Sequence, residues 1–339
     1  MDVTSLVSTA QAMVADGKGI LAIDESSGTI KKRFDSIGVE CTEENRRDYR
    51  GMLLSTAGLG EHISGAILFD ETLRQAAADG TSFVELMNEA GIIPGIKVDT
   101  GAHPLANHPG ELVTEGLDGL RARLQEYASL GARFAKWRAV ISISEATPSD
   151  ACINANCHAL ARYAGLCQEA GLVPMVEPEV LINGDHSLED CYEVTVLVLR
   201  RLFEQLYDQN VLLEGTILKA SMVISGDTAT DRAGYEEVAE ATVDCLLQSV
   251  PAALAGIVFL SGGQGDEEAT VHLDAMNKLG VFPWPLSFSY GRALQQPPLA
   301  EWGKDPAGNI ESAQKKLAHR ARMNGLAAMG EYNSGLEEG

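Results

Sequence analysis

Eight charged side chains near the ends of short apolar runs could together perform carbonyl chemistry on an anionic substrate. They comprise three lysines, two arginines and three carboxylates: Lys97, Lys136, Lys219, Arg138, Arg292, Asp24, Glu177 and Glu179. Ammonium and guanidinium groups bind substrate anions, and carboxylates transfer protons. A structural ion pair explains any single charge of this kind equally well, whereas charges that converge from several strand ends on one site indicate catalysis.

Lys219 closes the run Leu218–Lys219 and has the environment that a Schiff-base nucleophile requires. An amine attacks a carbonyl carbon only when it is neutral, and burial together with the nearby cations Lys136 and Lys97 favours the neutral form. The iminium that results withdraws electrons from the neighbouring carbon. The alternative for Lys219 is a structural, buried ion pair with Glu177 or Glu179.

Two glycine-bearing segments follow the last two apolar runs and could bind a phosphate. Ser261-Gly-Gly-Gln264 follows the seventh run, and Gly291-Arg292 follows the eighth. Barrels often bind phosphate at these two positions with backbone N–H groups. With Arg292 on the next strand and Arg33 in the helix after Asp24, the turn becomes a candidate anion cup.

The histidines and cysteines do not form a recognisable metal or redox motif. The seven histidines include no H-E-x-x-H sequence, and His158 beside Cys157 is the one tempting cluster. That cluster lies in an expected helix without a further ligand nearby, so we expect no metal. The six cysteines include no C-x-x-C pair and are expected to be reduced and half-buried.

The candidate residues lie within a repeating β–α pattern, which predicts an α/β fold, a TIM (β/α)8 barrel. Eight short, β-rich apolar runs lie at 19–24, 64–69, 92–99, 134–141, 173–179, 215–219, 256–261 and 285–290. Their centres are about 30 to 45 residues apart, the length of a strand and a crossover helix. The carboxyl ends of such strands surround one mouth, where catalytic groups belong.

The segments between the runs have helical spacing. Leu120, Leu124 and Tyr127 share one face of 118–128, and 192–207 carries a similar stripe. Further helices at about 5–16 and about 312–329 extend the barrel, and we expect a single domain over 1–339 with a C-terminal tail from about 330. A doubly wound sheet is the alternative, but it would carry a G-x-G-x-x-G loop, which this sequence lacks.

Composition excludes several classes of partner. The 339 residues carry a formal charge of −22, which repels nucleic acids and anionic lipids. No apolar run approaches the ~18 residues that span a bilayer, and the first residues lack the features of a signal peptide. We therefore expect a cytoplasmic protein that binds neither nucleic acid nor membrane; a mature plastid form is the alternative.

Seven segments in register resemble class I fructose-bisphosphate aldolase. They are GILAIDES (19–26), TEENRR (42–47), AKWR (135–138), VEPE (176–179), LEGTILK (213–219), LSGGQ (260–264) and FSYGRA (288–293). The match runs in order from about residue 5 to residue 332. The resemblance implies a lyase of glycolysis, gluconeogenesis or the Calvin cycle that cleaves fructose 1,6-bisphosphate reversibly to dihydroxyacetone phosphate and glyceraldehyde 3-phosphate. It also implies an enzyme without metal or cofactor that forms a homo-oligomer, a tetramer in most of the family.

Carried over position by position, the resemblance assigns a role to each catalytic candidate. Lys219 corresponds to the Schiff-base lysine, and Glu177 to the general acid and base for carbinolamine dehydration. Asp24 would take the C4 hydroxyl proton during carbon–carbon cleavage. Lys136 would assist proton transfer, and Glu179 would orient the cations.

The resemblance also implies two phosphate sites. The C1-phosphate site comprises Ser261, Gly262 and Arg292 with Arg33 nearby, and the C6-phosphate lies toward Lys97 and Arg138. The sequence departs from the family at Thr100, where many relatives have lysine, and at Ala220-Ser221, where Pro-Asn is common. The first departure changes the charge near the C6-phosphate, and we expect the second to alter only the exit of the strand.

A third departure concerns the end of the chain, which lacks the longer tail and terminal tyrosine of the animal enzymes. We therefore expect Glu177, or a water that it holds, to protonate the enamine without help from the tail. Two alternatives in function remain from the residues alone. One is another lysine Schiff-base barrel of the transaldolase or deoxyribose-phosphate aldolase type, and the other is a non-catalytic sugar-phosphate-binding scaffold.

Overall fold

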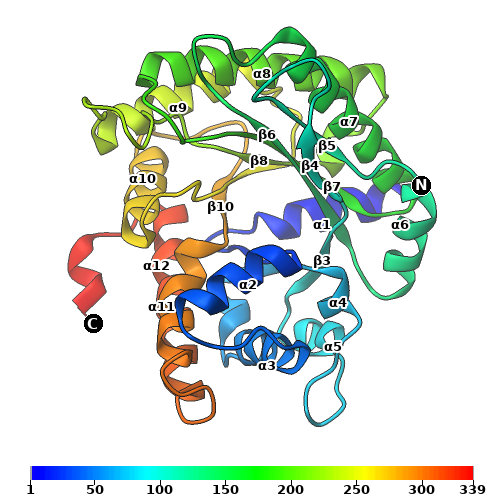
Figure 1. Ribbon diagram of the computed structural model, residues 1–339, viewed down its shortest axis with the longest axis vertical. Coiled ribbons are helices and arrows are strands. Elements are labelled where there is room, and N and C mark those ends of the chain that lie inside the picture. Colours follow the sequence, from blue (N-terminus) through cyan, green and yellow to red (C-terminus); the bar gives the residue numbers. More distant parts are fainter. Residues whose placement is uncertain (1, 339) are drawn as a thin grey trace.

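Eight parallel strands close into a barrel in the computed structural model, which describes residues 2–338 (Figure 1). The strands are β1 (Gly19–Ile23), β2 (Ile63–Leu68), β3 (Ile93–Lys97), β6 (Phe134–Ile141), β7 (Val173–Val180), β8 (Ile217–Ala220), β9 (Gly256–Phe259) and β10 (Leu286–Tyr290). Ile20 of β1 pairs with Ser289 of β10 and closes the ring. The predicted α/β barrel is confirmed, and each predicted run overlaps one of these strands.

Helices surround the barrel and cover its outer face, except α1, which covers its amino-terminal end (Figure 1). They are α1 (Val3–Met13), α2 (Ser27–Ser36), α3 (Glu43–Leu54), α4 (Asp70–Leu73), α5 (Phe83–Glu89), α6 (Leu120–Ser129), α7 (Asp150–Glu169), α8 (Leu188–Asp208), α9 (Tyr235–Ser249), α10 (Asp266–Lys278), α11 (Arg292–Trp302) and α12 (Ile310–Ala328). Leu120, Leu124 and Tyr127 of α6 are buried, as their spacing predicted. The helices at both ends of the chain are also present, as α1 and α12.

A two-stranded antiparallel hairpin between β3 and α6 was not predicted. It consists of β4 (Gly101–Pro104) and β5 (Leu112–Glu115). Its strands are short, β4 is mostly exposed and β5 is partly buried, so they lack the apolar alternation by which a strand is recognised in sequence. The sixth barrel strand also begins at Ile217 rather than at Gly215, because Leu213–Gly215 forms a 3-10 helix.

Apolar side chains from alternate strand positions fill the inside of the barrel. Ala22, Phe134, Met175 and Ile217 belong to this inner core, which α1 covers at the amino-terminal end of the barrel through residues such as Met13. Side chains two residues further along a strand lie on the same face and one layer higher. The residues one layer above these four are Asp24, Lys136, Glu177 and Lys219. The charged residues therefore lie directly above an apolar layer inside the barrel.

All six cysteines are free thiols. Five of them are buried, and Cys41 alone is half-buried, so the expectation of half-burial was wrong for most of the set. These five small side chains contribute to the packing of the core. None of the helices formed by residues 2–338 combines the length and the apolar character that a bilayer crossing requires.

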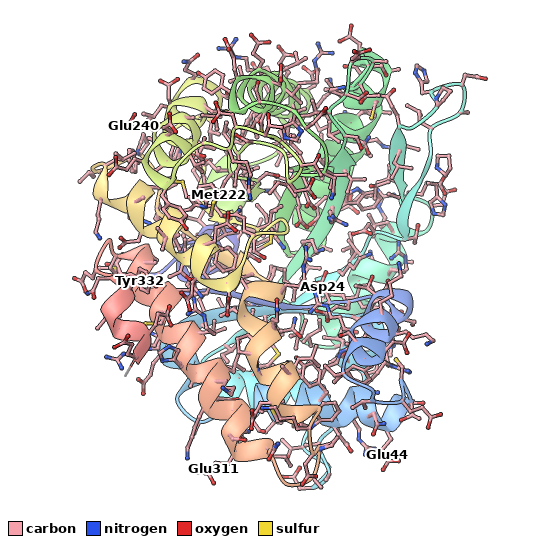
Figure 2. The ribbon with its side chains drawn as sticks, turned by 60° about the vertical axis from the view of Figure 1, so that its left-hand side comes forward. Asp24, Glu44, Met222, Glu240, Glu311 and Tyr332 are labelled. Atoms are coloured by element: carbon pink, nitrogen blue, oxygen red, sulfur yellow. The ribbon has the colours of Figure 1, made fainter. Side chains whose placement is uncertain are left out.

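The C-terminal segment packs against the outside of the barrel near α10 and α12 (Figures 1 and 2). The Tyr332 side chain is buried, and its hydroxyl donates a hydrogen bond of 2.9 Å to Glu337 Oε1. Glu337 also pairs with the buried Arg320 and, at 2.8 Å, with His319 of α12. The Glu337 carboxylate thus contacts the Arg320 guanidinium, the His319 ring and the Tyr332 hydroxyl.

Candidate active site

A pocket of about 890 Å³ opens at the carboxyl ends of the barrel strands. Every site residue expected from the sequence lines it: Asp24, Arg33, Lys97, Lys136, Arg138, Glu177, Glu179, Lys219, Ser261, Gly262 and Arg292. These residues come from seven of the eight barrel strands or from the segments that follow them. The structure therefore brings the predicted set to one mouth.

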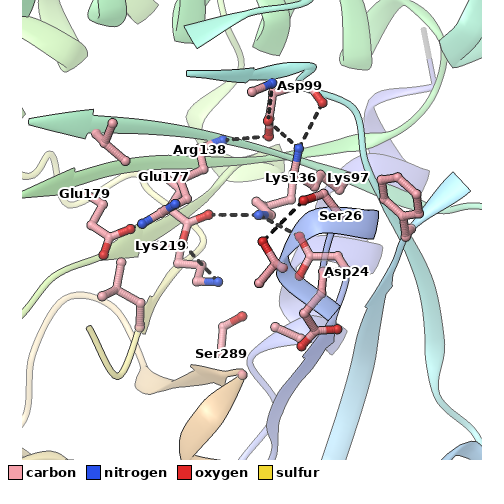
Figure 3. A pocket seen from close by; sticks show the side chains of 18 of the residues that line it. Asp24, Ser26, Lys97, Asp99, Lys136, Arg138, Glu177, Glu179, Lys219 and Ser289 are labelled. Atoms are coloured by element: carbon pink, nitrogen blue, oxygen red, sulfur yellow. Dashed lines mark hydrogen bonds and ion pairs between the residues drawn. The ribbon is translucent and has the colours of Figure 1, made fainter. Parts of the chain in front are cut away.

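Four of these side chains form a continuous row, in which Lys219, Glu177 and Lys136 are buried and Asp24 is partly buried (Figure 3). Lys219 Nζ lies 3.0 Å from Glu177 Oε1, and Lys136 Nζ lies 3.2 Å from Glu177 Oε2. The same Lys136 ammonium lies 2.7 Å from Asp24 Oδ2. Of the two ion pairs that the sequence left open for Lys219, the structure contains the one with Glu177. We call Lys219, Glu177, Lys136 and Asp24 the proton-transfer row.

Charge within the row keeps both carboxylates ionised. Burial by itself would raise the pKa of Asp24, but Lys136 and then Lys219 oppose it and lower the pKa to about 2. Burial also opposes ionisation of Glu177, and again Lys136 and Lys219 outweigh it, so its pKa falls below the ordinary value. For Lys136, burial favours the neutral amine, but Asp24 and Glu177 raise the pKa of its ammonium. At neutral pH the row contains two carboxylate acceptors joined by a protonated lysine.

A second cluster of cations stands at another part of the mouth. The Lys97 ammonium donates to Asp99 Oδ1 and, at 2.9 Å, to the Asp99 carbonyl oxygen. The Arg138 guanidinium pairs with Glu179, and the Arg138 backbone N–H donates to Asp99 Oδ2 at 3.2 Å. Both cations thus have carboxylate partners. A phosphate that binds here would share the two cations with those carboxylates. The ion pair with Glu179 holds the Arg138 guanidinium at this part of the mouth.

The anion cup is assembled from a glycine turn and two arginines. Gly262 and Gly263 have φ angles of +47° and +97°, a left-handed conformation that favours glycine. A Cβ atom at Gly263 would lie 3.6 Å from Arg292 Nη2, and a Cβ atom at Gly291 would lie 3.6 Å from Arg33 Nη2. The two guanidinium groups therefore lie against the backbone of the two glycine segments.

Sequence reasoning missed several residues that hold the predicted ones in place. Glu25 pairs with Arg33 at 2.6 Å, and Asp99 connects Lys97 to the backbone of Arg138. Ser289, on the last strand, points into the pocket, and its hydroxyl has no hydrogen-bond partner among the described residues (Figure 3). A polar residue in the last layer of a strand was an available signal for Asp99 and Ser289, but the partner of Arg33 depends on tertiary packing.

Within residues 2–338 no group of three or more histidine, cysteine or carboxylate side chains is arranged to hold a metal ion. The two members of the tempting pair in α7 point to different neighbours. His158 Nδ1 lies 2.9 Å from the side-chain oxygen of Gln205 in α8. The Cys157 thiol is buried beside the backbone of Val198, and burial raises its pKa to about 12. This pair therefore packs α7 against α8.

Comparison with known proteins gives one consistent result. Residues 5–339 match the family model described as glycolytic, fructose-bisphosphate aldolase class-I. The chain is 66% identical over 332 residues to the probable fructose-bisphosphate aldolase class 1 of Xanthomonas campestris, with 98% of this chain and 99% of that protein covered. It is 51% identical to the cytosolic fructose-bisphosphate aldolase 4 of Arabidopsis thaliana, over 98% of this chain and 85% of that protein.

A solved structure agrees with these relatives. It is the fructose-bisphosphate aldolase of Plasmodium falciparum in complex with TRAP and a small-molecule inhibitor. The TM-score is 0.96 at 50% sequence identity, and the match covers 98% of this chain and 96% of that one. Both the fold and the sequence therefore point to the same family.

Proposed function

The chain belongs to the class I fructose-bisphosphate aldolase family, and we propose that its proton-transfer row carries out the cleavage, with Lys219 as the nucleophile. The observation that supports this most directly is the unbroken contact from Lys219 through Glu177 and Lys136 to Asp24. Glu177 contacts the Lys219 amine, which must lose a proton, and Asp24 lies at the other end of the row. The family membership leaves no place for the transaldolase-like or scaffold alternatives.

The first stage is formation of the imine. The neutral Lys219 amine attacks the C2 carbonyl carbon of open-chain fructose 1,6-bisphosphate and forms a carbinolamine. Glu177, 3.0 Å from the nitrogen, takes a proton from the Lys219 ammonium before the attack. During the addition a proton of the amine passes to the C2 oxygen. The protonated Glu177 then donates its proton to the resulting C2 hydroxyl, which leaves as water and gives the iminium. The protonated Lys136 stabilises the Glu177 carboxylate before the first transfer and after the second.

The second stage is cleavage of the bond between C3 and C4. Asp24, ionised because Lys136 and Lys219 lower its pKa, accepts the C4 hydroxyl proton. The electron pair of the C3–C4 bond moves toward the iminium and leaves an enamine on Lys219, while glyceraldehyde 3-phosphate departs. Protonation of C3 by Glu177 or a water beside it, and hydrolysis of the imine, then release dihydroxyacetone phosphate. The same steps in reverse give condensation, so one site serves glycolysis, gluconeogenesis or the Calvin cycle.

The two phosphates of the substrate occupy the two cationic regions of the mouth. The anion cup, with Ser261, Gly262, Arg292 and Arg33, holds the C1-phosphate through backbone N–H groups and guanidinium groups. Lys97 and Arg138 face the C6-phosphate and exchange part of their contact with Asp99 and Glu179 for it. Binding at both ends places C2 beside Lys219 and C4 beside Asp24.

Trapping with borohydride tests this function. We expect reduction in the presence of dihydroxyacetone phosphate to inactivate the enzyme and to leave one covalent adduct, which mass spectrometry locates on Lys219. Label on Lys136 or Lys97, or no label, would contradict the mechanism. Cleavage activity should also persist in EDTA, since the iminium is the electron sink; activity lost and then restored by Zn²⁺ would be evidence against it.

We further propose that the chain acts as a single domain in a homotetramer in the cytoplasm. The packing of α1 and α12 against the barrel supports the first part. Exposed apolar side chains on neighbouring helices, Leu197 and Tyr207 of α8 and Leu247 of α9, support self-association. Arabidopsis relatives named cytosolic support the location. Sedimentation equilibrium would measure the oligomeric state, and a monomer at micromolar concentration would refute that part.

A further inference from the structure

A buried amide stands directly behind the anion cup. Gln264 follows the Ser261-Gly262-Gly263 turn, and its side chain extends into the protein, where the residue is 7% exposed. Its Oε1 lies 2.6 Å from Nδ1 of His272, which is 2% exposed on α10, and its Nε2 lies 3.5 Å from the sulfur of Met222 (labelled in Figure 2). One side chain thus connects the turn, α10 and the segment after Lys219.

The direction of the hydrogen bond follows from the chemistry of the three groups. Burial lowers the pKa of His272 to about 4, so the ring is neutral at physiological pH and carries one N–H. A thioether sulfur accepts weakly and cannot donate, so the NH₂ of Gln264 faces Met222 and its carbonyl oxygen faces His272. His272 therefore donates from Nδ1. The ring of Tyr235, with its centroid 4.9 Å away at 63° to the imidazole plane, holds the ring in place.

This contact determines where the turn lies. The Gln264 backbone N–H donates to the Ser261 carbonyl oxygen at 2.8 Å and so closes the turn on itself. The Gln264 side chain then fixes the closed turn to α10, while Ile182 packs against Gly263 from the opposite loop. Glycines give the turn its conformation but no side chains with which to anchor it. The anchoring of the backbone N–H groups of the cup thus depends on Gln264 and its partner.

We propose that His272 is a positioning residue for the C1-phosphate, acting through Gln264 on the backbone of the anion cup. The inference rests on the proposed function, because it assigns His272 to one of the two phosphate sites. His272 touches no substrate. Its loss should weaken binding of dihydroxyacetone phosphate, whose phosphate occupies the cup, and spare glyceraldehyde 3-phosphate, whose phosphate lies at Lys97 and Arg138.

Two substitutions in the full-length enzyme test the N–H donor and the ring of His272 separately. His272→Phe removes the N–H and keeps the ring, whereas His272→Asn keeps an N–H at the position of Nδ1. In the condensation assay we expect His272→Phe to raise the KM for dihydroxyacetone phosphate about five- to tenfold, the usual worth of one buried hydrogen bond. The KM for glyceraldehyde 3-phosphate and kcat should stay within about twofold, and His272→Asn should restore the KM for dihydroxyacetone phosphate.

A matched control comes from the same helix. Asn277 of α10 donates to the Leu273, Leu286 and Ala327 carbonyl oxygens, away from the cup. Asn277→Ala should lower the melting temperature and leave both KM values unchanged, as expected of a residue with a structural role alone. Gln264→Met removes the same hydrogen bond from the other side, and should reproduce the KM effect even where His272→Phe does not fold.

The outcomes distinguish this inference from the function on which it rests. If wild-type Lys219 is trapped by borohydride but His272→Phe and Gln264→Met bind dihydroxyacetone phosphate as wild type does, the inference is wrong and the function stands. Equal loss of affinity for both triose phosphates would also overturn it, since that result marks general damage to the mouth. Failure to trap Lys219 in the wild type would instead count against the proposed function.

Discussion

The proton-transfer row and the anion cup lie in one pocket, but the protein builds them in different ways. Lys136, Glu177 and Lys219 stand on three neighbouring barrel strands, one layer above apolar residues of the same strands. The cup consists of loop backbone in left-handed conformation, together with arginines from α2 and from the start of α11. The alternation of side chains along each strand therefore positions the row, whereas contacts with neighbouring segments, such as that of Gln264 with His272, position the cup.

Because the two regions are built differently, we expect substitutions in the row to affect the chemical steps and substitutions in the cup to affect substrate binding. Side chains of the row touch one another, so a change in one alters the charge on the rest, and such damage should appear in kcat. In the proposed function the groups of the cup contact the C1-phosphate and not the bond that breaks, so damage there should appear in KM for ligands that carry the C1-phosphate. Substitutions on each side test whether this division holds.

The largest effect should come from Lys219→Arg. A guanidinium group has a pKa above ~12 and is never a neutral nucleophile, so we expect cleavage to fall by a factor of at least ~10³ and borohydride trapping to disappear. Steady-state cleavage coupled to a dehydrogenase measures this. Activity within tenfold of wild type would mean that the row does not contain the nucleophile.

Glu177→Gln should come next. The amide cannot carry a proton from the Lys219 nitrogen to the departing hydroxyl, so kcat should fall by about 10²- to 10⁴-fold with little change in KM. Glu179→Gln is the matched control, because Glu179 pairs with Arg138 and not with a lysine of the row. A fall in kcat as large as that of Glu177→Gln would show that the two carboxylates act as one unit.

Arg292→Ala tests the cup. A charge-assisted hydrogen bond is worth ~1.5–3 kcal/mol, so the KM for fructose 1,6-bisphosphate should rise about 10- to 100-fold while kcat changes little. In the condensation direction, the KM for dihydroxyacetone phosphate should rise and that for glyceraldehyde 3-phosphate should not. Equal changes for the two triose phosphates would point to a structural role for the arginine.

Deletion of residues 333–339 should affect neither region. The described part of this segment packs outside the barrel, where Glu337 pairs with the buried Arg320. We expect cleavage and proton exchange on dihydroxyacetone phosphate to stay within about twofold. The melting temperature should fall because the buried Arg320 loses the carboxylate with which it pairs. A tenfold fall in exchange, ~1.4 kcal/mol in barrier, would show that the tail takes part in protonating the enamine.

The residues of the proton-transfer row could be predicted from the sequence because their positions depend on short-range spacing within each strand. A charged residue two places after a buried apolar one, at the end of a strand, already points into the mouth, as in Met175 and Glu177 or Ile217 and Lys219. The order of the eight strands followed from the repeat of apolar runs. Both features depend on short-range spacing, which one sequence contains.

What could not be predicted depends on contacts between distant segments. Nothing in the sequence near Arg33 or Gln264 indicates that Glu25 faces the first or that His272 faces the second. The hairpin at 101–115 was missed because its strands are short and one of them is mostly exposed. Supporting residues of this kind are chosen by tertiary packing, and their types alone do not distinguish them from surface polar residues.

The pairing of β1 with β10 also constrains when this enzyme can become active. Residues 20 and 289 are neighbours in the closed barrel, and Arg292 follows the strand that closes it. A ribosome adding ~5–20 residues per second therefore makes the two ends of the sheet well apart in time. Until β10 emerges, both edges of the unfinished sheet expose unpaired backbone groups and the mouth lacks one wall. Activity should therefore arise in a late, cooperative step of folding, and an incomplete nascent chain should be more prone to aggregation than the finished protein.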